Sequence, residues 1–253
     1  MALFGQRHQD GERIEIAGLT VRLSVNARAR RISLRIDRVR REPVAVAPSL
    51  RRLSEAVAFA RRRADWMAER IAELAPPISL KAGDEVQIFG QPCRLAPDGR
   101  RPRLALAPGD GSWILSGCGV GRVDIQLVAR AIRGRARTVF AQRIACHCAA
   151  LGVLAEPALR LGDARGRWGS CTPARRGRPA SIRLSWRLAL APFEVADYVA
   201  AHECAHLIEA HHGPAFWTLV RALVGDEKPH RAWLTTEGPR LHAIGQHGGP
   251  QGV

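Results

Sequence analysis

The chain has 253 residues, of which 46% are hydrophobic and 25% charged, as in a globular protein of one large domain or two modest ones. Lys and Arg outnumber Asp and Glu by 39 to 23, and no apolar run approaches the roughly eighteen residues that a membrane span needs. These numbers exclude a transmembrane protein. The first residues also lack the charged-then-apolar order of a secretory signal, so we expect a cytoplasmic protein with no membrane partner.

The net charge of +16 raises the question of a nucleic-acid partner, because arginine neutralises phosphate. The basic residues are spread along the chain in short groups, at 28–31, 38–41, 61–63, 100–103, 130–137 and 175–178. Dispersed charge is more typical of a solvated surface than of a dedicated groove. Nucleic acid bound through a basic surface is therefore a secondary expectation, and the oligomeric state does not follow from the composition.

Alternating apolar residues predict several β-strands at the start of the chain. Residues 14–25 and 32–36 alternate between apolar and polar, and 44–47 form a short apolar run. From Ser54 the apolar spacing changes to three and four. This predicts one helix over Ser54–Leu74, which Pro76-Pro77 terminates.

The middle of the chain suggests a boundary. Residues 78–118 return to β character, with Gly- and Pro-containing turns between short apolar runs, and a second long helix is predicted over 125–152. We therefore expect an N-terminal β-rich region with one helix over 1–122 and a second domain over 123–244. Residues 245–253 are expected to form a flexible tail.

Cys146, His147 and Cys148 resemble a metal cluster at first sight, but they lie within that second predicted helix. Adjacent helical residues point about 100° apart and cannot converge on one ion, so we expect ordinary packing there. The six cysteines of the chain also lack the spacing of a disulfide scaffold.

The last third of the chain predicts a strand followed by helices. Residues 181–188 alternate as a half-buried strand, and Pro192 opens a helix. Gly213-Pro214 interrupts the chain before an amphipathic helix over 216–224. With the β-rich region before it, this order predicts an α+β fold in which a helix packs on a small sheet.

The predicted helix after Pro192 carries His202-Glu203-Cys204-Ala205-His206, the His-Glu-x-x-His pattern of zinc hydrolases. Four residues are about one helical turn, so both imidazoles project from one face, within reach of one ion. Glu203 lies about 100° round the helix, suited to a water on the metal rather than to ligation. Zinc lowers the pKa of such a water towards about 7, and Glu203 is expected to act as general base.

A catalytic zinc needs a third protein ligand, for which His212 is the leading candidate. A continuing helix would carry His212 about 120° off the metal face, so the helix must end and the chain turn back. His211 is of a type tolerated in the left-handed conformation of such a turn, and is itself a weaker candidate ligand. The remaining alternatives are Glu227 or Glu237 from a later helix and Cys171 from upstream.

Arg167, Trp168, Gly169, Ser170 and Cys171 form a second segment of interest. Trp and Cys in this segment are compatible with simple core packing, and Gly with a tight turn. The functional interpretation is that the segment and strand 181–188 line the cleft. An exposed strand edge there would pair with an extended peptide.

Together these segments resemble the YgjP-like metallopeptidase family, which is more distantly related to SprT-like zincins. The matching segments are 28–36, 167–171, 182–188, 197–199, 202–207, 212–217 and 231–234. The resemblance implies a zincin-like domain with His202, His206 and His212 as zinc ligands and Glu203 as base. Here His211 and Gly213 flank His212, where the family usually has Asn and Ser.

The leading hypothesis is a zinc-dependent metallopeptidase that hydrolyses peptide bonds of a peptide or protein substrate. The first alternative is a metal-dependent RNA endonuclease with the same histidine spacing, although such a family typically lacks the Glu after the first His. The second alternative is a nucleic-acid-associated protein in which zinc is structural. That site would need a fourth protein ligand.

Overall fold

The computed structural model describes residues 7–37, 40–74, 76–99, 101–107, 112–164 and 166–245. It divides into two compact units, an N-terminal unit up to Pro77 and a C-terminal unit over Ile78–Gly245. The tail expected over 245–253 lies, from 246 onward, outside the described residues.

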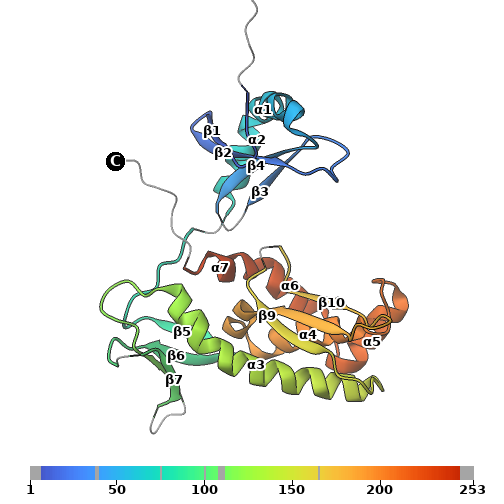
Figure 1. Ribbon diagram of the computed structural model, residues 1–253. Helices are drawn as coiled ribbons and strands as arrows, with labels where there is room; N and C mark the ends of the chain where they lie inside the picture. The colour runs from blue at the N-terminus through green and yellow to red at the C-terminus, as the bar shows by residue number, and fades with distance from the viewer. Residues whose placement is uncertain are drawn as a thin grey trace, which may run out of the picture. The chain divides into compact units, whose positions relative to one another are not determined.

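The N-terminal unit is built on a four-stranded sheet of order β1-β2-β4-β3 (Figure 1). Its strands are β1 (Arg13–Ile16), β2 (Leu19–Val25), β3 (Ser33–Asp37) and β4 (Glu42–Ala47), which agree with the sequence expectation. β4 is buried along its whole length, because it pairs with β2 on one side and with β3 on the other.

Two helices cover this sheet where the sequence predicted one over Ser54–Leu74. After a short 3-10 turn, η1 (Leu50–Arg52), α1 (Leu53–Arg62) and α2 (Ala64–Ala72) follow each other. Between them Arg63 leaves the helical region, with φ −115° and ψ 23°. This break redirects the chain, so that Met67 of α2 enters the same core as Val57 of α1.

The C-terminal unit begins with a second four-stranded sheet, of order β5-β6-β8-β7. Its strands are β5 (Glu85–Ile88), β6 (Gln91–Leu95), β7 (Arg103–Leu106) and β8 (Trp113–Ser116). Residues of these strands share one hydrophobic core with the helices that follow. The segment 78–118, expected in the N-terminal region, is therefore packed within the C-terminal unit. That residues 123–244 act alone as a metallopeptidase domain stays a prediction.

The long helix α3 (Ile125–Ala150) packs along α4 (Phe193–Ala205) and a three-stranded sheet of order β10-β11-β9 (Figure 1). The strands are β9 (Ala158–Gly162), β10 (Gly169–Thr172) and β11 (Ser181–Ser185). β9 was not anticipated, and residues 169–172 form a strand where a turn was expected.

Residues 181–188 do not remain a strand to their end. β11 stops at Ser185, and Trp186–Leu190 form a 3-10 helix, η2. The Ser185 side chain accepts a hydrogen bond from the Arg187 backbone N–H and so caps this helix. All five residues of η2 are buried. The alternation of buried and exposed residues that predicts a strand therefore does not extend into Trp186–Leu190.

Three further helices complete the C-terminal unit: α5 (Pro214–Val224), α6 (Lys228–Thr236) and α7 (Gly238–Ala243). The fold is α+β, as expected, with a zincin-like helix packed on a small sheet. Throughout the described chain, each helix is either too short or too polar to pass through a bilayer.

Candidate metal centre

Helix α4 places two of the candidate ligands. It begins after Pro192, carries Glu194 in its first turn, where a carboxylate complements the helix dipole, and buries Val195 and Val199 in the core. His202 lies in its last turn and His206 caps its C-terminal end. Their rings are 5.0 Å apart between centroids, as expected for residues one turn apart on one face.

His212 comes from the connection between α4 and α5. The helix ends at His206, and the chain turns back before Gly213, which caps α5, with Pro214 in the first turn. His211 is not left-handed, because the non-glycine residues with positive φ in the described chain lie elsewhere. Instead the Gly213 N–H donates to the His211 carbonyl at 2.7 Å, so a tight turn replaces the left-handed residue that we expected.

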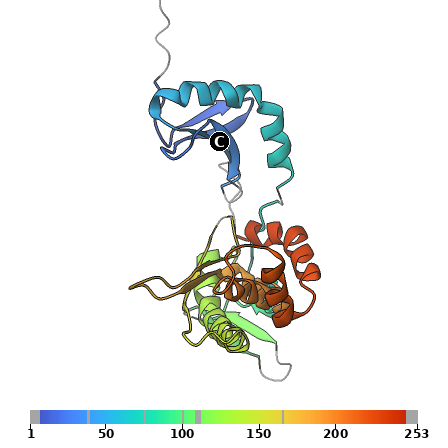
Figure 2. The ribbon, with the colours of Figure 1, turned by 90° about the vertical axis from the view of Figure 1, so that its right-hand side faces the viewer.

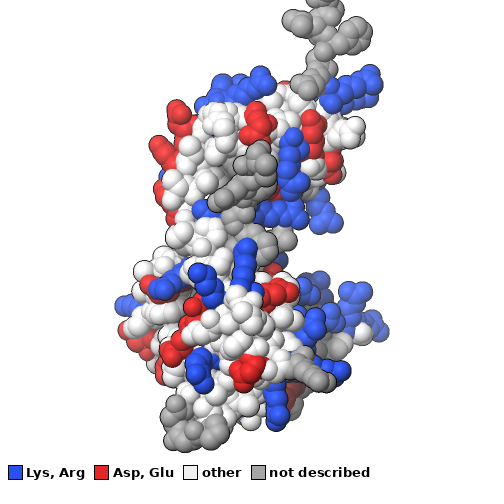
Figure 3. All heavy atoms as spheres, turned by 90° about the vertical axis from the view of Figure 1, so that its left-hand side faces the viewer, with Lys and Arg blue, Asp and Glu red and all other residues white. Residues whose placement is uncertain are grey.

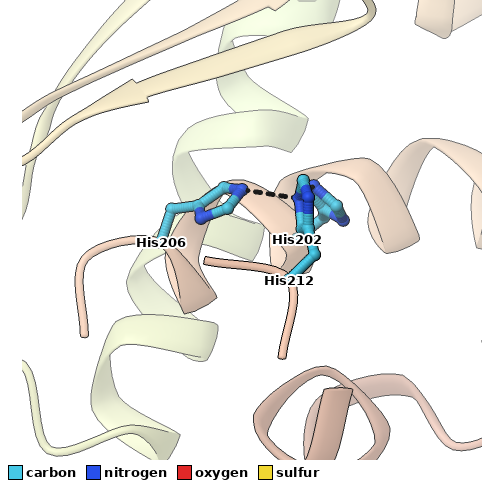
Figure 4. A group of neighbouring side chains, drawn as sticks. All are labelled: His202, His206 and His212. Carbon is cyan, nitrogen blue, oxygen red and sulfur yellow. Dashed lines mark hydrogen bonds between the residues drawn. The ribbon is translucent and has the colours of Figure 1, made fainter. Parts of the chain in front are cut away.

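The three imidazoles converge through their Nε2 atoms (Figure 4). His212 Nε2 lies 3.1 Å from His202 Nε2 and 3.1 Å from His206 Nε2. Among the described His, Cys, Asp and Glu residues, this is the group of three or more whose possible ligand atoms come within 4.8 Å of one another. The alternatives weighed from the sequence, His211, Glu227, Glu237 and Cys171, are not members of it.

This arrangement fits a zinc ion. Four-coordinate zinc with nitrogen ligands at about 2.1 Å sets those nitrogens about 3.4 Å apart, close to the observed spacing. Metal binding requires neutral imidazoles. Burial and the positive charges of the other histidines and Arg231 lower the pKa of His202 to about 4. Burial and neighbouring positive charge also lower the pKa of His212.

Contacts behind the ligands fix their orientation. His206 Nδ1 lies 3.0 Å from the Glu209 carbonyl oxygen, which makes Nδ1 the donor and leaves the Nε2 lone pair free for a metal. The Tyr198 hydroxyl lies 3.5 Å from His202 Nδ1. Phe216 is fully buried, and its ring centroid lies 4.5 to 4.8 Å from those of all three histidines.

Glu203 follows His202 on α4, and its side chain is buried. It is 5% exposed, and its Oε2 is buried without a hydrogen-bond partner among the described residues. Burial raises the pKa of Glu203 to about 7, while the charge of Arg167 and the backbone N–H of Cys171 act in the opposite direction. A carboxylate with a pKa near the working pH and one free oxygen suits proton transfer.

The segment Arg167–Cys171 lies against this carboxylate only in part. Gly169 packs on Glu203 so closely that a Cβ would overlap the carboxylate. The positive charge of Arg167 and the backbone N–H of Cys171 both lower the pKa of Glu203. Trp168 instead stacks on His242, with ring centroids 4.4 Å apart. Ser170 lies on β10 between Gly169 and Cys171 and is half-buried.

One supporting group was not recognised from the sequence as part of the site. Asp197 of α4 accepts hydrogen bonds from Arg143 Nε at 2.7 Å and Arg143 Nη2 at 3.0 Å, and His147 Nε2 lies 2.7 Å from it. This network joins α3 to the ligand-bearing helix. Because Asp197 lies fifty or more residues from its partners, no local pattern reveals the pairing. It also accounts for the buried His147. Of the three residues Cys146-His147-Cys148, His147 and Cys148 are buried and Cys146 is exposed, and none belongs to the metal-ligand group.

A family model, the YgjP-like metallopeptidase domain, matches residues 30–237 and so includes every residue of this site. The chain belongs to the YgjP-like metallopeptidase family. Membership of this family supports a metal-dependent peptidase. The match begins at residue 30 and thus covers part of the N-terminal unit as well as nearly all of the C-terminal unit.

This YgjP-like chain also has a similarity to one solved structure, titled "Crystal structure of the metallopeptidase zymogen of Pyrococcus abyssi abylysin". The similar region covers 39% of this chain and 95% of that chain, with 18% sequence identity and a TM-score of 0.32. So low a score adds nothing to the argument from the family. No curated protein matches the chain.

Proposed function

We propose that this YgjP-like protein is a zinc peptidase in which His202, His206 and His212 hold the metal and Glu203 is the general base. One observation carries the proposal. Three imidazole Nε2 atoms converge, and Glu203, the residue after His202 on α4, is a buried carboxylate with one oxygen that has no hydrogen-bond partner among the described residues. That is the donor set and the base required for metal-assisted hydrolysis.

The donor set favours zinc in a catalytic role. Three neutral nitrogen ligands suit zinc better than magnesium or calcium, which prefer oxygen. A structural zinc requires four protein ligands, whereas the group found among the described residues has three. The fourth position would therefore be open to water and substrate.

A zinc ion held by His202, His206 and His212 would lower the pKa of a bound water and polarise the carbonyl of the substrate. Glu203 Oε2, unpartnered and buried, receives the proton of the attacking water. Glu203 can then return that proton to the leaving amine nitrogen. Gly169 leaves the space that this carboxylate occupies.

The free edge of β10 provides a place for an extended peptide. β10 pairs with β11 on one side only, and it packs on α4, the helix that carries the histidines. The Ser185 N–H donates to the Trp168 carbonyl, so the backbone groups of Gly169 and Cys171 face away from β11, as alternate residues do in an antiparallel ladder. The Cys171 N–H acts on Glu203, which leaves the Gly169 groups and the Cys171 carbonyl for a peptide. A substrate strand would pair along this edge.

The decisive experiment compares wild type with Glu203→Gln after zinc loading. We expect wild type to contain about one zinc per chain and to cleave unfolded protein or peptide substrates. The variant keeps the zinc, since Glu203 is not a ligand, and loses at least about a thousandfold in kcat/KM because it cannot accept the proton. Undiminished cleavage by Glu203→Gln, or cleavage of RNA in place of peptides, would contradict the proposal.

A further inference from the structure

The outer face of the β10-β11-β9 sheet is hollowed into a basin of about 840 Å³. Two of its residues, Arg160 on β9 and Arg183 on β11, are register partners and so point to the same face. Arg175 and Arg178 reach it from the hairpin between β10 and β11, and Arg167 from the segment before β10. We call these five residues and the hollow between them the arginine basin.

Apart from the adjoining Glu203, whose carboxylate acts on Arg167, the described residues bring no opposing charge to the arginine basin. Its lining includes no Asp or Glu, all five arginines are exposed, and within the described chain none has an acidic partner at ion-pair distance. The hairpin projects from the C-terminal unit (Figure 2), and basic side chains gather on the corresponding side of that unit in the space-filling view (Figure 3). Like charges directly opposite in a sheet are destabilising, so an anionic ligand would relieve the Arg160–Arg183 repulsion.

The basin adjoins the candidate catalytic site. Arg167 and Cys171 both line it, and both interact with the Glu203 carboxylate. Ser170 and Thr172 also line it, from the strand whose free edge faces the substrate. A peptide that pairs with β10 presents every second side chain to the outer face of the sheet, where the basin lies.

We infer that the arginine basin binds Asp and Glu side chains of the substrate, so that the enzyme prefers peptides with acidic residues flanking the cleaved bond. The inference rests on the peptidase function proposed above. Guanidinium groups form two parallel hydrogen bonds to a carboxylate, which gives both affinity and direction. The hollow is large enough for more than one side chain.

The main rival occupant is nucleic acid, and two observations favour the acidic peptide. The described residues that line the basin include no aromatic side chain on which a base could stack. The basin is also a single hollow next to Glu203 rather than a track of cations along a surface, which a phosphate backbone would require.

The test uses zinc-loaded full-length protein and three peptides of equal length that differ only in alternate positions, which hold Glu, Gln or Lys. We expect kcat/KM to be about tenfold higher for the Glu peptide than for the Gln peptide, and lowest for the Lys peptide. Binding of the same peptides to Glu203→Gln, measured by fluorescence anisotropy, gives the same order without any cleavage. The preference weakens at high salt, because solvent screens exposed charges.

Variants locate the effect. Arg160→Ala/Arg183→Ala removes the preference for Glu over Gln and leaves cleavage of the Gln peptide near wild type. The matched control, Arg130→Ala/Arg133→Ala, removes two exposed arginines of α3 outside the basin and keeps the preference. Arg160→Glu/Arg183→Glu reverses it towards the Lys peptide, a gain that misfolding cannot produce.

The outcomes separate the two proposals. If kcat/KM is equal for the Glu and Gln peptides, the arginine basin does not bind acidic side chains, and the peptidase proposal stands. The same holds if Arg160→Ala/Arg183→Ala keeps the preference for the Glu peptide. Selective binding of Glu peptides to a protein that cleaves none overturns the peptidase alone. A single-stranded oligonucleotide that binds through the same arginines, while Glu peptides do not bind, assigns the basin to nucleic acid and overturns our inference. If the double variant does not fold, Arg175→Ala/Arg178→Ala in the hairpin replaces it.

Discussion

Gly169 and Glu203 are packed so closely that the glycine has room for a hydrogen only. A Cβ on Gly169 would overlap the Glu203 carboxylate, although the two residues lie on different elements, β10 and α4. Strand β10 therefore limits where the carboxylate of the proposed base can lie.

Replacing Gly169 with alanine should disable the base without removing the metal. The added methyl group displaces the carboxylate, so we expect kcat/KM to fall at least about a hundredfold with zinc content unchanged. Gly166→Ala is the matched control, since a Cβ at Gly166 meets nothing within 4 Å. A Gly169→Ala enzyme as active as Gly166→Ala would show that Glu203 does not depend on this contact.

Adjacent histidines allow a sharp test of the third ligand. We expect His212→Ala to lose zinc affinity by about a thousandfold or more, because only two of three convergent nitrogens remain. His211→Ala should bind zinc as wild type does, since His211 is outside the convergent group. Zinc titration against a competing chelator measures both. Equal loss in the two variants would place His211 at the metal too.

Tyr198 is expected to support His202 rather than to bind substrate. Its hydroxyl lies 3.5 Å from His202 Nδ1, and its ring stacks on His230. Tyr198→Phe keeps the ring and removes the hydroxyl, so we expect about tenfold weaker zinc binding, as is typical when such an outer partner is lost. An unchanged thermal midpoint would show that packing is preserved. Zinc affinity equal to wild type would exclude the orienting role.

The Asp197 network predicts a pH-dependent contribution to stability. Hydrogen bonds and charge from His147 and Arg143 hold the pKa of Asp197 below its usual value of 3.8, despite the opposing effect of burial. The depressed pKa means that this stabilisation is fully present above pH 3.8 and is lost as the pH falls through the lower folded-state value. Asp197→Asn should cost about 2 kcal/mol or more at pH 7.

Urea unfolding of wild type and Asp197→Asn at a series of pH values tests this sign. The difference in unfolding free energy between the two should shrink as the pH falls below about pH 4. A difference that does not shrink at low pH would mean that the carboxylate is not stabilised in its charged form.

The local part of this architecture was predictable from the sequence. Helical periodicity placed His202 and His206 on one face of one helix, and strand alternation located β1 to β4, because both depend on residues a few positions apart. Gly213-Pro214 marked the start of α5 for the same reason. The break at Arg63 and the end of β11 at Ser185 were not predictable in this way, because core packing decided them.

What only the tertiary structure decided are the relationships between distant segments. It brought His212, rather than Glu227 or Cys171, to the other two histidines, because the connection between α4 and α5 follows no regular period. It set Gly169 against Glu203, and it aligned Arg160 with Arg183 across two strands. Sequence spacing carries the geometry of a single helix or strand, whereas these contacts arise from how several elements pack around a shared core.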